Sequence, residues 1–208
     1  MSARIVLMTK VPVAGQVKTR LRPVLSPMGA VALHRAMIFD TLSLVKAAGL
    51  PCTVSVAGEM DHPVVADLRA LGLDVEAQFG ADLGERLVHA LRGAKRAVAI
   101  GADCVCFDPD WLREAAEAEA PVSLGPAEDG GYWLIAVDPS ARVVVFEDIP
   151  WSTDKVHQQT LARAVSAGLE VHQVPQCYDI DRPEDLARLF RDPRCPAQTR
   201  AVLESLRT

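Results

Sequence analysis

This sequence lacks the features that mark the most easily recognised classes of protein. Its 208 residues contain no run approaching the about 20 apolar residues of a membrane span, and the apolar run at 5–8 is too short for a secretory signal. Its five cysteines form neither a paired CxxC motif nor a disulfide framework. We therefore expect a cytoplasmic protein with reduced cysteines and no membrane partner.

Acidic side chains are also missing from the first 39 residues, although the whole chain carries a net charge of −5. That segment holds six cations, so the remainder of the chain carries −11. An acidic body argues against general binding to nucleic acids or to anionic membranes. A local basic region on such a body suits a small anionic ligand better than a polymer. The densest part of that region is PVAGQVKTRLRP at 12–23, which contains Lys18, Arg20 and Arg22.

Short apolar segments alternate with amphipathic segments along the whole chain. This alternation favours a mostly parallel β-sheet covered by helices on both faces. No linker or repeat divides the sequence, so we expect one α/β domain over residues 1–208. Strands are expected at 4–9, 52–57, 74–78, 97–101, 121–125, 132–137 and 169–174. Helices are expected at 26–48, 62–72, 82–94, 108–120, 154–168, 183–190 and 197–206.

Ligands of such folds bind beyond the carboxyl ends of the strands, which is where the basic loop begins. Gly15 permits close approach of the backbone to a ligand, and Lys18 and Arg20 are expected to be exposed and able to bind phosphate oxygens. The loop is not a P-loop, because Val17 stands where that motif needs glycine. The alternative interpretation is a solvated surface loop.

Three aspartates are expected near the same edge of the sheet. Asp103 follows the buried strand at 97–101, and Asp179 and Asp181 are two apart in an extended segment, so both can face one ion. The alternative interpretations are that Asp103 serves a turn and that Asp181 caps the helix that starts at Pro183. Together with the cations, the aspartates predict a divalent metal ion that bridges a bound di- or triphosphate.

The segment GPAEDGGYWLI at 125–135 permits two interpretations. Asp-Gly between two strands is a strong hairpin signal. Alternatively, Gly130 and Gly131 make room for a ligand, and Asp129 holds a hydroxyl group or acts as a base.

Six motifs occur in order between residues 5 and 189. They resemble the GT-A-fold transferases called selenodomain-associated transferases of type 1, within the nucleotide-diphospho-sugar transferase superfamily. They are also similar to small nucleotidyltransferases such as phospholactate and molybdenum-cofactor guanylyltransferases. One departure is Val105 with Cys106, where the family usually has proline followed by a polar residue. The motifs are PVAGQVKTRL, GADLGERL, GADC, LGPAEDGGYWLI, DIPWSTD and DIDRPEDL.

The resemblance implies a Rossmann-like GT-A fold and a role for each matching residue. The nucleotide phosphates would be held by Gly15, Lys18, Thr19 and Arg20, and the base or ribose would lie near Gly84 and Arg86. Asp103 would be one ligand of Mg²⁺ or Mn²⁺, and Asp179 or Asp181 would be the second. The acceptor would contact Asp129, Gly130, Trp151, Ser152 and Thr153, and the catalytic residues would be Lys18, Asp103 and Asp129.

Two transfer reactions fit these residues. In nucleotidyl transfer from a nucleoside triphosphate, a phosphate-bearing acceptor needs no strong base. In glycosyl transfer from a nucleotide-sugar, a hydroxyl acceptor needs a base, and Asp129 is the best candidate. The alternatives are a non-catalytic nucleotide-binding protein and an enzyme that uses Cys104, for which the scattered histidines suggest no partner. The nucleotide base, the sugar, the small-molecule acceptor and the oligomeric state stay open.

Overall fold

The computed structural model describes residues 3–206 and contains one seven-stranded sheet, in the order β3-β2-β1-β4-β6-β5-β7. Strand β6 is antiparallel to both β4 and β5, and the other neighbouring strands are parallel. The expected mostly parallel α/β sheet is therefore confirmed. The strands are β1 (Arg4–Lys10), β2 (Cys52–Ala57), β3 (Asp74–Ala77), β4 (Ala97–Gly101), β5 (Val122–Pro126), β6 (Tyr132–Val137) and β7 (Val171–Gln173).

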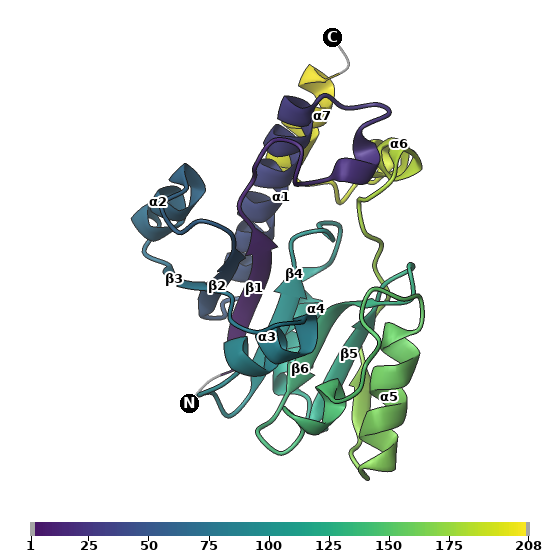
Figure 1. The fold of residues 1–208 in the computed structure, drawn as a ribbon. Helices are drawn as coiled ribbons and strands as arrows, with labels where there is room; N and C mark the ends of the chain where they lie inside the picture. Colours follow the sequence, from purple (N-terminus) through teal and green to yellow (C-terminus); the bar gives the residue numbers. More distant parts are fainter. Residues whose placement is uncertain (1–2, 207–208) are drawn as a thin grey trace.

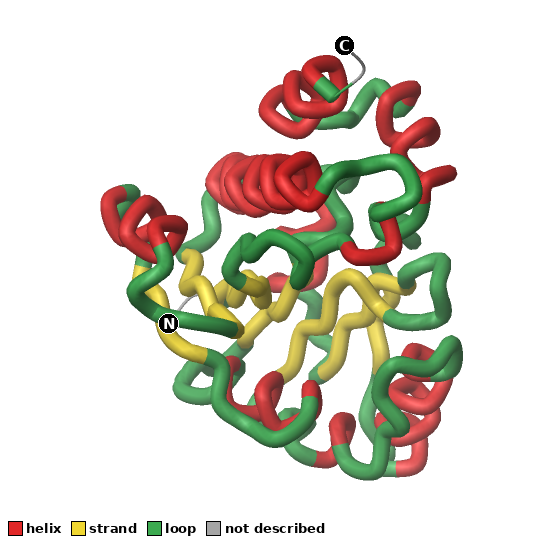
Figure 2. The backbone as a smooth tube through the Cα atoms, turned by 45° about the horizontal axis from the view of Figure 1, so that its top comes forward, coloured by secondary structure: helices red, strands yellow, loops and turns green. Residues whose placement is uncertain are grey.

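Helices cover both faces of the sheet (Figures 1 and 2). Successive strand residues point to opposite faces, so Ile5 and Leu7 pack with α1, α2 and α4, whereas Val6 packs with α3 and α5. The helices are α1 (Pro27–Ala47), α2 (Pro63–Ala70), α3 (Leu83–Ala90), α4 (Pro109–Glu117), α5 (Val156–Ser166), α6 (Pro183–Arg191) and α7 (Ala197–Ser205).

A third apolar cluster joins the end of the chain to its beginning. Leu189 of α6 and Leu203 of α7 pack with Leu33 and Met37 of α1 and with Leu21 of the basic loop. Figure 1 shows α6, α7 and the start of α1 at one end of the molecule. The basic loop is thus held on one side by residues from the far end of the sequence.

Helix α1 is the longest helix, and its length and composition would suffice to cross a membrane. However, 61% of its apolar window is buried inside the fold, as expected for a core helix. Ser26 caps it by accepting a hydrogen bond from the Gly29 amide at 3.0 Å, and Pro27 occupies its first turn, as the sequence predicts.

The expected strands and helices are all present, with shifts at their ends. The largest shifts are in α3 and α4, which end three to four residues earlier than expected, at Ala90 and Glu117. Two short 3₁₀ helices at Thr19–Leu21 and Val144–Phe146 carry no periodic signal and are not predicted.

Candidate functional site

A cleft of about 740 Å³ lies at the carboxyl ends of β1 and β4. Strands β1, β2, β3 and β4 are mutually parallel, so the segments that follow them meet at one edge of the sheet. The cleft is lined by segments at the ends of three strands: the end of β1, Gln78 after β3, and residues 101–103 at the end of β4. Its other walls are the basic loop at 16–20, the start of α3, Trp151, Ser152 and Asp181.

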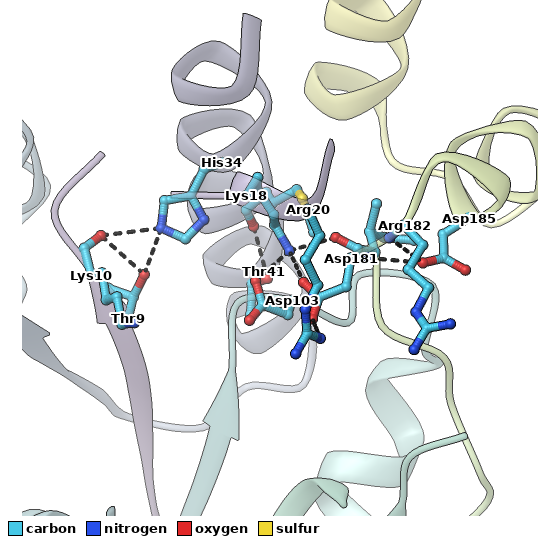
Figure 3. A network of polar contacts seen from close by, with 12 residues as sticks. Thr9, Lys10, Lys18, Arg20, His34, Thr41, Asp103, Asp181, Arg182 and Asp185 are labelled. Atoms are coloured by element: carbon cyan, nitrogen blue, oxygen red, sulfur yellow. Dashed lines mark hydrogen bonds and ion pairs between the residues drawn. The ribbon is translucent and has the colours of Figure 1, made fainter. Parts of the chain in front are cut away.

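Lys18 lies at the centre of the polar contacts in this cleft (Figure 3). Its Nζ donates to Asp103 Oδ1 at 2.5 Å, to the carbonyl of Ile180 at 2.7 Å and to Asp181 Oδ1 at 3.4 Å. Its side chain is only 2% exposed, so the expectation of an exposed cation is wrong. Burial alone would lower the pKa of Lys18, but the charges of Asp103 and Asp181 outweigh it and raise that pKa. The charged ammonium therefore joins three segments that are distant in sequence.

Asp103 and Asp181 contact this ammonium, and the charge of Asp179 also acts on it, whereas a fourth carboxylate, Asp129, lies near Asp179. Burial would raise the pKa of Asp103, but Lys18 holds it below its ordinary value. Burial and, after it, the neighbouring charges of Asp129, Asp103 and Asp181 together raise the pKa of Asp179 to about 7. The three aspartates that the sequence singles out are thus brought together, with Asp129 beside them, and negative charge is in excess.

Asp181 does not cap α6, and that expectation is wrong. The N-cap residue is Arg182, and Asp185 Oδ2 reaches back to accept from the amides of Asp181 at 3.0 Å and Arg182 at 2.6 Å. The Asp181 carboxylate is therefore left for the site, where it also contacts Arg20 at 3.3 Å.

The remaining residues of the basic loop differ in their exposure to the cleft. Thr19 and Arg20 line it, and the Arg20 side chain is 69% exposed. Gly15, at φ +78°, lies outside the lining, where its carbonyl accepts from the Arg22 guanidinium at 2.8 Å. Arg22 therefore stabilises the loop conformation through a hydrogen bond within the loop.

The hairpin at 127–131 confirms the turn interpretation of its sequence, whereas the ligand-binding interpretation stays a prediction. It is the turn between β5 and β6, and Asp129 Oδ1 accepts from the Gly131 amide at 2.9 Å. Gly130 has φ +90°, and a Cβ atom there would overlap the backbone of Asp154, so the position requires glycine. Neither Asp129 nor Gly130 lines the cleft itself; Asp129 lies on the side where Asp179 is.

The segment 151–153 and the start of α3 meet at one wall of the cleft. Trp151 and Ser152 line that wall, whereas the Thr153 hydroxyl donates to the Pro150 carbonyl at 3.0 Å and lies outside the lining. Gly84 is not part of the lining either. It makes room for Trp151, because a Cβ atom there would lie 2.9 Å from the indole ring. Arg86 lines the cleft and donates to the Gly80 carbonyl at 3.1 Å.

Two further residues of the cleft, Gln78 and His34, belong to no sequence motif, and the sequence did not predict them. The Gln78 side-chain amide donates to the carbonyls of Thr9 at 3.1 Å and Ser55 at 3.0 Å. Both amide hydrogens are used, so the group that Gln78 can still offer to a ligand is its side-chain oxygen, which is a hydrogen-bond acceptor. His34 is buried, donates from Nε2 to the Lys10 carbonyl at 3.1 Å, and has its pKa lowered by burial. Gln78 follows β3, so applying the strand-end rule to that weak strand would have found it.

The carboxylate cluster suits a hard divalent cation, although no metal cage is preformed. Among residues 3–206, no three His, Cys, Asp or Glu side chains already converge as metal ligands. The Lys18 ammonium lies between Asp103 and Asp181 instead. Burial and the charges of neighbouring carboxylates raise the pKa of Asp179, and a bound cation would oppose both effects. Carboxylate oxygens are the ligands that Mg²⁺ and Mn²⁺ prefer.

Cys104 and Cys177 form a disulfide beside this cluster, which corrects the expectation of reduced cysteines. The two residues are 73 positions apart, so their spacing carried no signal. Cys104 is 1% exposed and its sulfur is bonded, which leaves no thiol there to act as a nucleophile. Cys106 is a buried free thiol, as expected for a small apolar residue.

The comparisons with known proteins agree with this geometry. The family model "Uncharacterized protein conserved in bacteria (DUF2064)" matches residues 41–153. A 2-phospho-L-lactate guanylyltransferase of Halorubrum lacusprofundi is 34% identical over 83% of this chain and 78% of its own. A phosphoenolpyruvate guanylyltransferase of Rubrobacter xylanophilus is 31% identical over 83% of this chain and 86% of its own. The crystal structure of a provisionally named nucleotide-diphospho-sugar transferase from Desulfovibrio desulfuricans G20 superposes with a TM-score of 0.86, at 30% identity, over 99% of this chain and 95% of that one.

Proposed function

This chain belongs to the DUF2064 family, and from its site and its relatives we propose that it is a nucleotidyltransferase. The donor is a nucleoside triphosphate, and the acceptor is a small molecule that carries a phosphate group. The observation that carries the proposal is the junction of Lys18, Asp103 and Asp181 at the carboxyl ends of the strands, with Asp179 beside it.

A divalent cation, Mg²⁺ or Mn²⁺, would be held by Asp103, Asp179 and Asp181. When bound, it would neutralise charge on the phosphate groups of donor and acceptor. Because Lys18 contacts two of these carboxylates, its ammonium would exchange part of that contact for a phosphate oxygen.

The other cleft residues would hold the nucleotide. Arg20 is exposed beside Asp181, so its guanidinium can donate to phosphate oxygens from the rim of the cleft. The acceptor oxygen of Gln78 suits the N–H groups of a nucleobase, and Arg86 supplies donors nearby. An acceptor oxygen beside donors fits a base edge that presents an N–H next to an acceptor, as guanine does, and the preference for guanine itself rests on the names of the relatives.

The acceptor would bind between the hairpin at 127–131 and the segment at 151–153. In the reaction, an acceptor phosphate oxygen forms a bond to the α-phosphorus, and the bond from that phosphorus to pyrophosphate breaks. A phosphate acceptor is already ionised at neutral pH, so no strong base is needed. The names of the two guanylyltransferase relatives favour this reaction, with phosphorylated three-carbon acids as acceptors.

Glycosyl transfer is the second candidate, because the similar crystal structure is named for nucleotide-diphospho-sugars. It would require a base for a hydroxyl acceptor, and Asp129 would serve. A non-catalytic nucleotide-binding protein would not need so many carboxylates beside its phosphate site. The cytoplasmic location remains a prediction.

Pyrophosphate release separates these alternatives. The protein would be incubated with each of four nucleoside triphosphates, Mg²⁺, and either phosphoenolpyruvate or 2-phospholactate, with Asp103→Asn as the inactive control. We expect pyrophosphate and a nucleotidylated acceptor, with GTP preferred. Release of a nucleoside diphosphate from a nucleotide-sugar, without pyrophosphate release from any triphosphate, would replace nucleotidyl transfer by glycosyl transfer. Tight nucleotide binding without any turnover would support the non-catalytic alternative.

A further inference from the structure

Arg188 of α6 makes two contacts with residues that neighbour the carboxylate cluster. Its guanidinium donates to both carboxylate oxygens of Glu128, at 2.6 and 2.8 Å. It also lies over the ring of Tyr178, with 3.7 Å between the guanidinium carbon and the ring centroid. Glu128 directly precedes Asp129, and Tyr178 directly precedes Asp179. Arg188 thus connects the residues that directly precede Asp129 and Asp179, two aspartates of like charge.

Tyr178 is the buried partner in these contacts. It is 3% exposed, packs in the cluster formed by α1, α6 and α7, and donates its hydroxyl hydrogen to Asp192 at 3.0 Å. The hairpin side is less enclosed, because Glu128 and Asp129 are both exposed. The bidentate pair between Arg188 and Glu128 restricts orientation as well as distance. It therefore fixes how the tip of the hairpin at 127–131 is oriented towards Tyr178.

The fold does not depend on these contacts of Arg188. The hairpin is already anchored by backbone hydrogen bonds from Glu128 to the Cys177 carbonyl at 3.2 Å and from His157 to the Gly130 carbonyl at 2.9 Å. Exposed ion pairs contribute little to stability, and both partners here are 47% exposed. The contact therefore has more effect on the position of the hairpin tip than on folding.

We propose that Arg188 is a positioning residue for the acceptor: by holding Glu128 against Tyr178, it keeps Asp129 at the Asp179 side of the site. Without it, repulsion between the carboxylates moves the hairpin tip outward. The acceptor role of the hairpin rests on the proposed function, whereas the restraint on the hairpin does not.

The chain offers a matched control for this contact. Arg35 pairs with Asp67 at 2.9 Å and lies 4.6 Å from the ring centroid of Phe39. These partners are 49% and 46% exposed, as in the Glu128 pair, but they connect α1 with α2 and do not line the cleft. Arg35→Ala therefore removes an ion pair and a cation–π contact of similar exposure from a different place, although with one hydrogen bond in place of two.

The test compares Arg188→Ala, Arg188→Lys and Arg35→Ala by pyrophosphate release at saturating GTP and varied phosphoenolpyruvate. We expect Arg188→Ala to raise the KM for phosphoenolpyruvate by about 10- to 100-fold, with GTP affinity and thermal stability as in Arg35→Ala. Arg188→Lys should recover only part of the loss, since an ammonium lacks the planar fork. The charge-swapped pair Glu128→Arg with Arg188→Glu should recover part as well.

Amide hydrogen exchange supplies a second readout that needs no turnover. Residues 128–131 should exchange faster in Arg188→Ala than in Arg35→Ala. Equal exchange in the two variants, or an unchanged KM for phosphoenolpyruvate in an active protein, overturns the proposal. Loss of GTP affinity together with thermal stability also overturns it, since that pattern marks a structural role. If the parent protein releases no pyrophosphate, the proposed function fails, and exchange alone decides whether Arg188 restrains the hairpin.

Discussion

Lys18 and Arg20 belong to one loop, but their surroundings give them different roles. The Arg20 side chain is 69% exposed, and the polar contact it makes within residues 3–206 is with Asp181. We expect Arg20→Ala to lose one charge-assisted bond to phosphate, about 1.5–3 kcal/mol or roughly 10- to 150-fold in nucleotide affinity. Stability without ligand should change by about 1 kcal/mol or less. Nucleotide titration and thermal unfolding of the same sample check both statements, and an unchanged affinity would remove Arg20 from the site.

Lys18→Ala should cost both affinity and stability. The buried ammonium satisfies the Ile180 carbonyl and offsets the charges of Asp103 and Asp181. These carboxylates are 51% and 36% exposed, so water recovers part of the loss, and we expect a decrease of about 1–3 kcal/mol in the free energy of unfolding. A ligand-free variant as stable as the parent would contradict the position assigned to Lys18.

Asp179 makes stability depend on pH in a defined direction. Its pKa is about 7 in the folded protein, above the ordinary value of 3.8, so the folded state binds this proton more tightly than the unfolded state. The resulting contribution is complete below about pH 4 and is lost as pH rises towards about 7. Urea unfolding of metal-free protein across this range should show a decline that is absent from Asp179→Asn. Parallel curves for parent and variant would show that Asp179 titrates normally.

Among the elements, α3 affects the cleft through Gly84, which lies outside the cleft lining. A methyl group at Gly84 would lie 2.9 Å from the Trp151 ring, so Gly84→Ala should displace Trp151 and lower nucleotide affinity several-fold. Gly29→Ala in α1 is the matched control, because its Cβ atom would also lie 2.9 Å from a side chain, that of Leu206, away from the cleft. Similar nucleotide affinities in the two variants would show that Trp151 does not contact the nucleotide.

At this scale the sequence predicts which elements exist better than how they meet. Alternating apolar segments were sufficient for the strands and helices because both periodicities are local. The position of β6 between β4 and β5 depends on pairings across the sheet, which no local pattern encodes. The cap of α6 was misassigned because Asp185 supplies the acceptor from inside the helix.

The same distinction holds for the site. Asp103, Asp179 and Asp181 could be predicted to meet because strand ends share one edge of the sheet. The burial of Lys18 could not, since it depends on the Ile180 carbonyl, 162 residues away. Likewise, Gln78 and His34 belong to no motif, and their roles arise from the backbone carbonyls that happen to face them.

For the whole molecule, the charges predict that nucleotide and metal bind together. Asp103 and Asp181 already pair with Lys18, and Asp181 also pairs with Arg20. A triphosphate without a metal ion therefore competes with these carboxylates for the two cations. Nucleotide with Mg²⁺ at 100 times its Kd should stabilise the fold by about 2.7 kcal/mol, and nucleotide with a chelator by much less. Thermal unfolding with each ligand alone and with both checks this. An equal shift with and without Mg²⁺ would contradict a metal-dependent site.

The separation of Lys18 from its partners also has a consequence for the synthesis of the protein. Lys18 leaves the ribosome 163 residues before Asp181, a delay of roughly ten to thirty seconds at about 5–20 residues per second. During that interval Leu21, Leu33 and Met37 lack Ile180, Leu189 and Leu203, which cover them in the finished fold. The nascent chain therefore exposes an apolar surface that chaperones can bind. A chain released before Asp181 lacks part of its carboxylate site and cannot act as a partial enzyme.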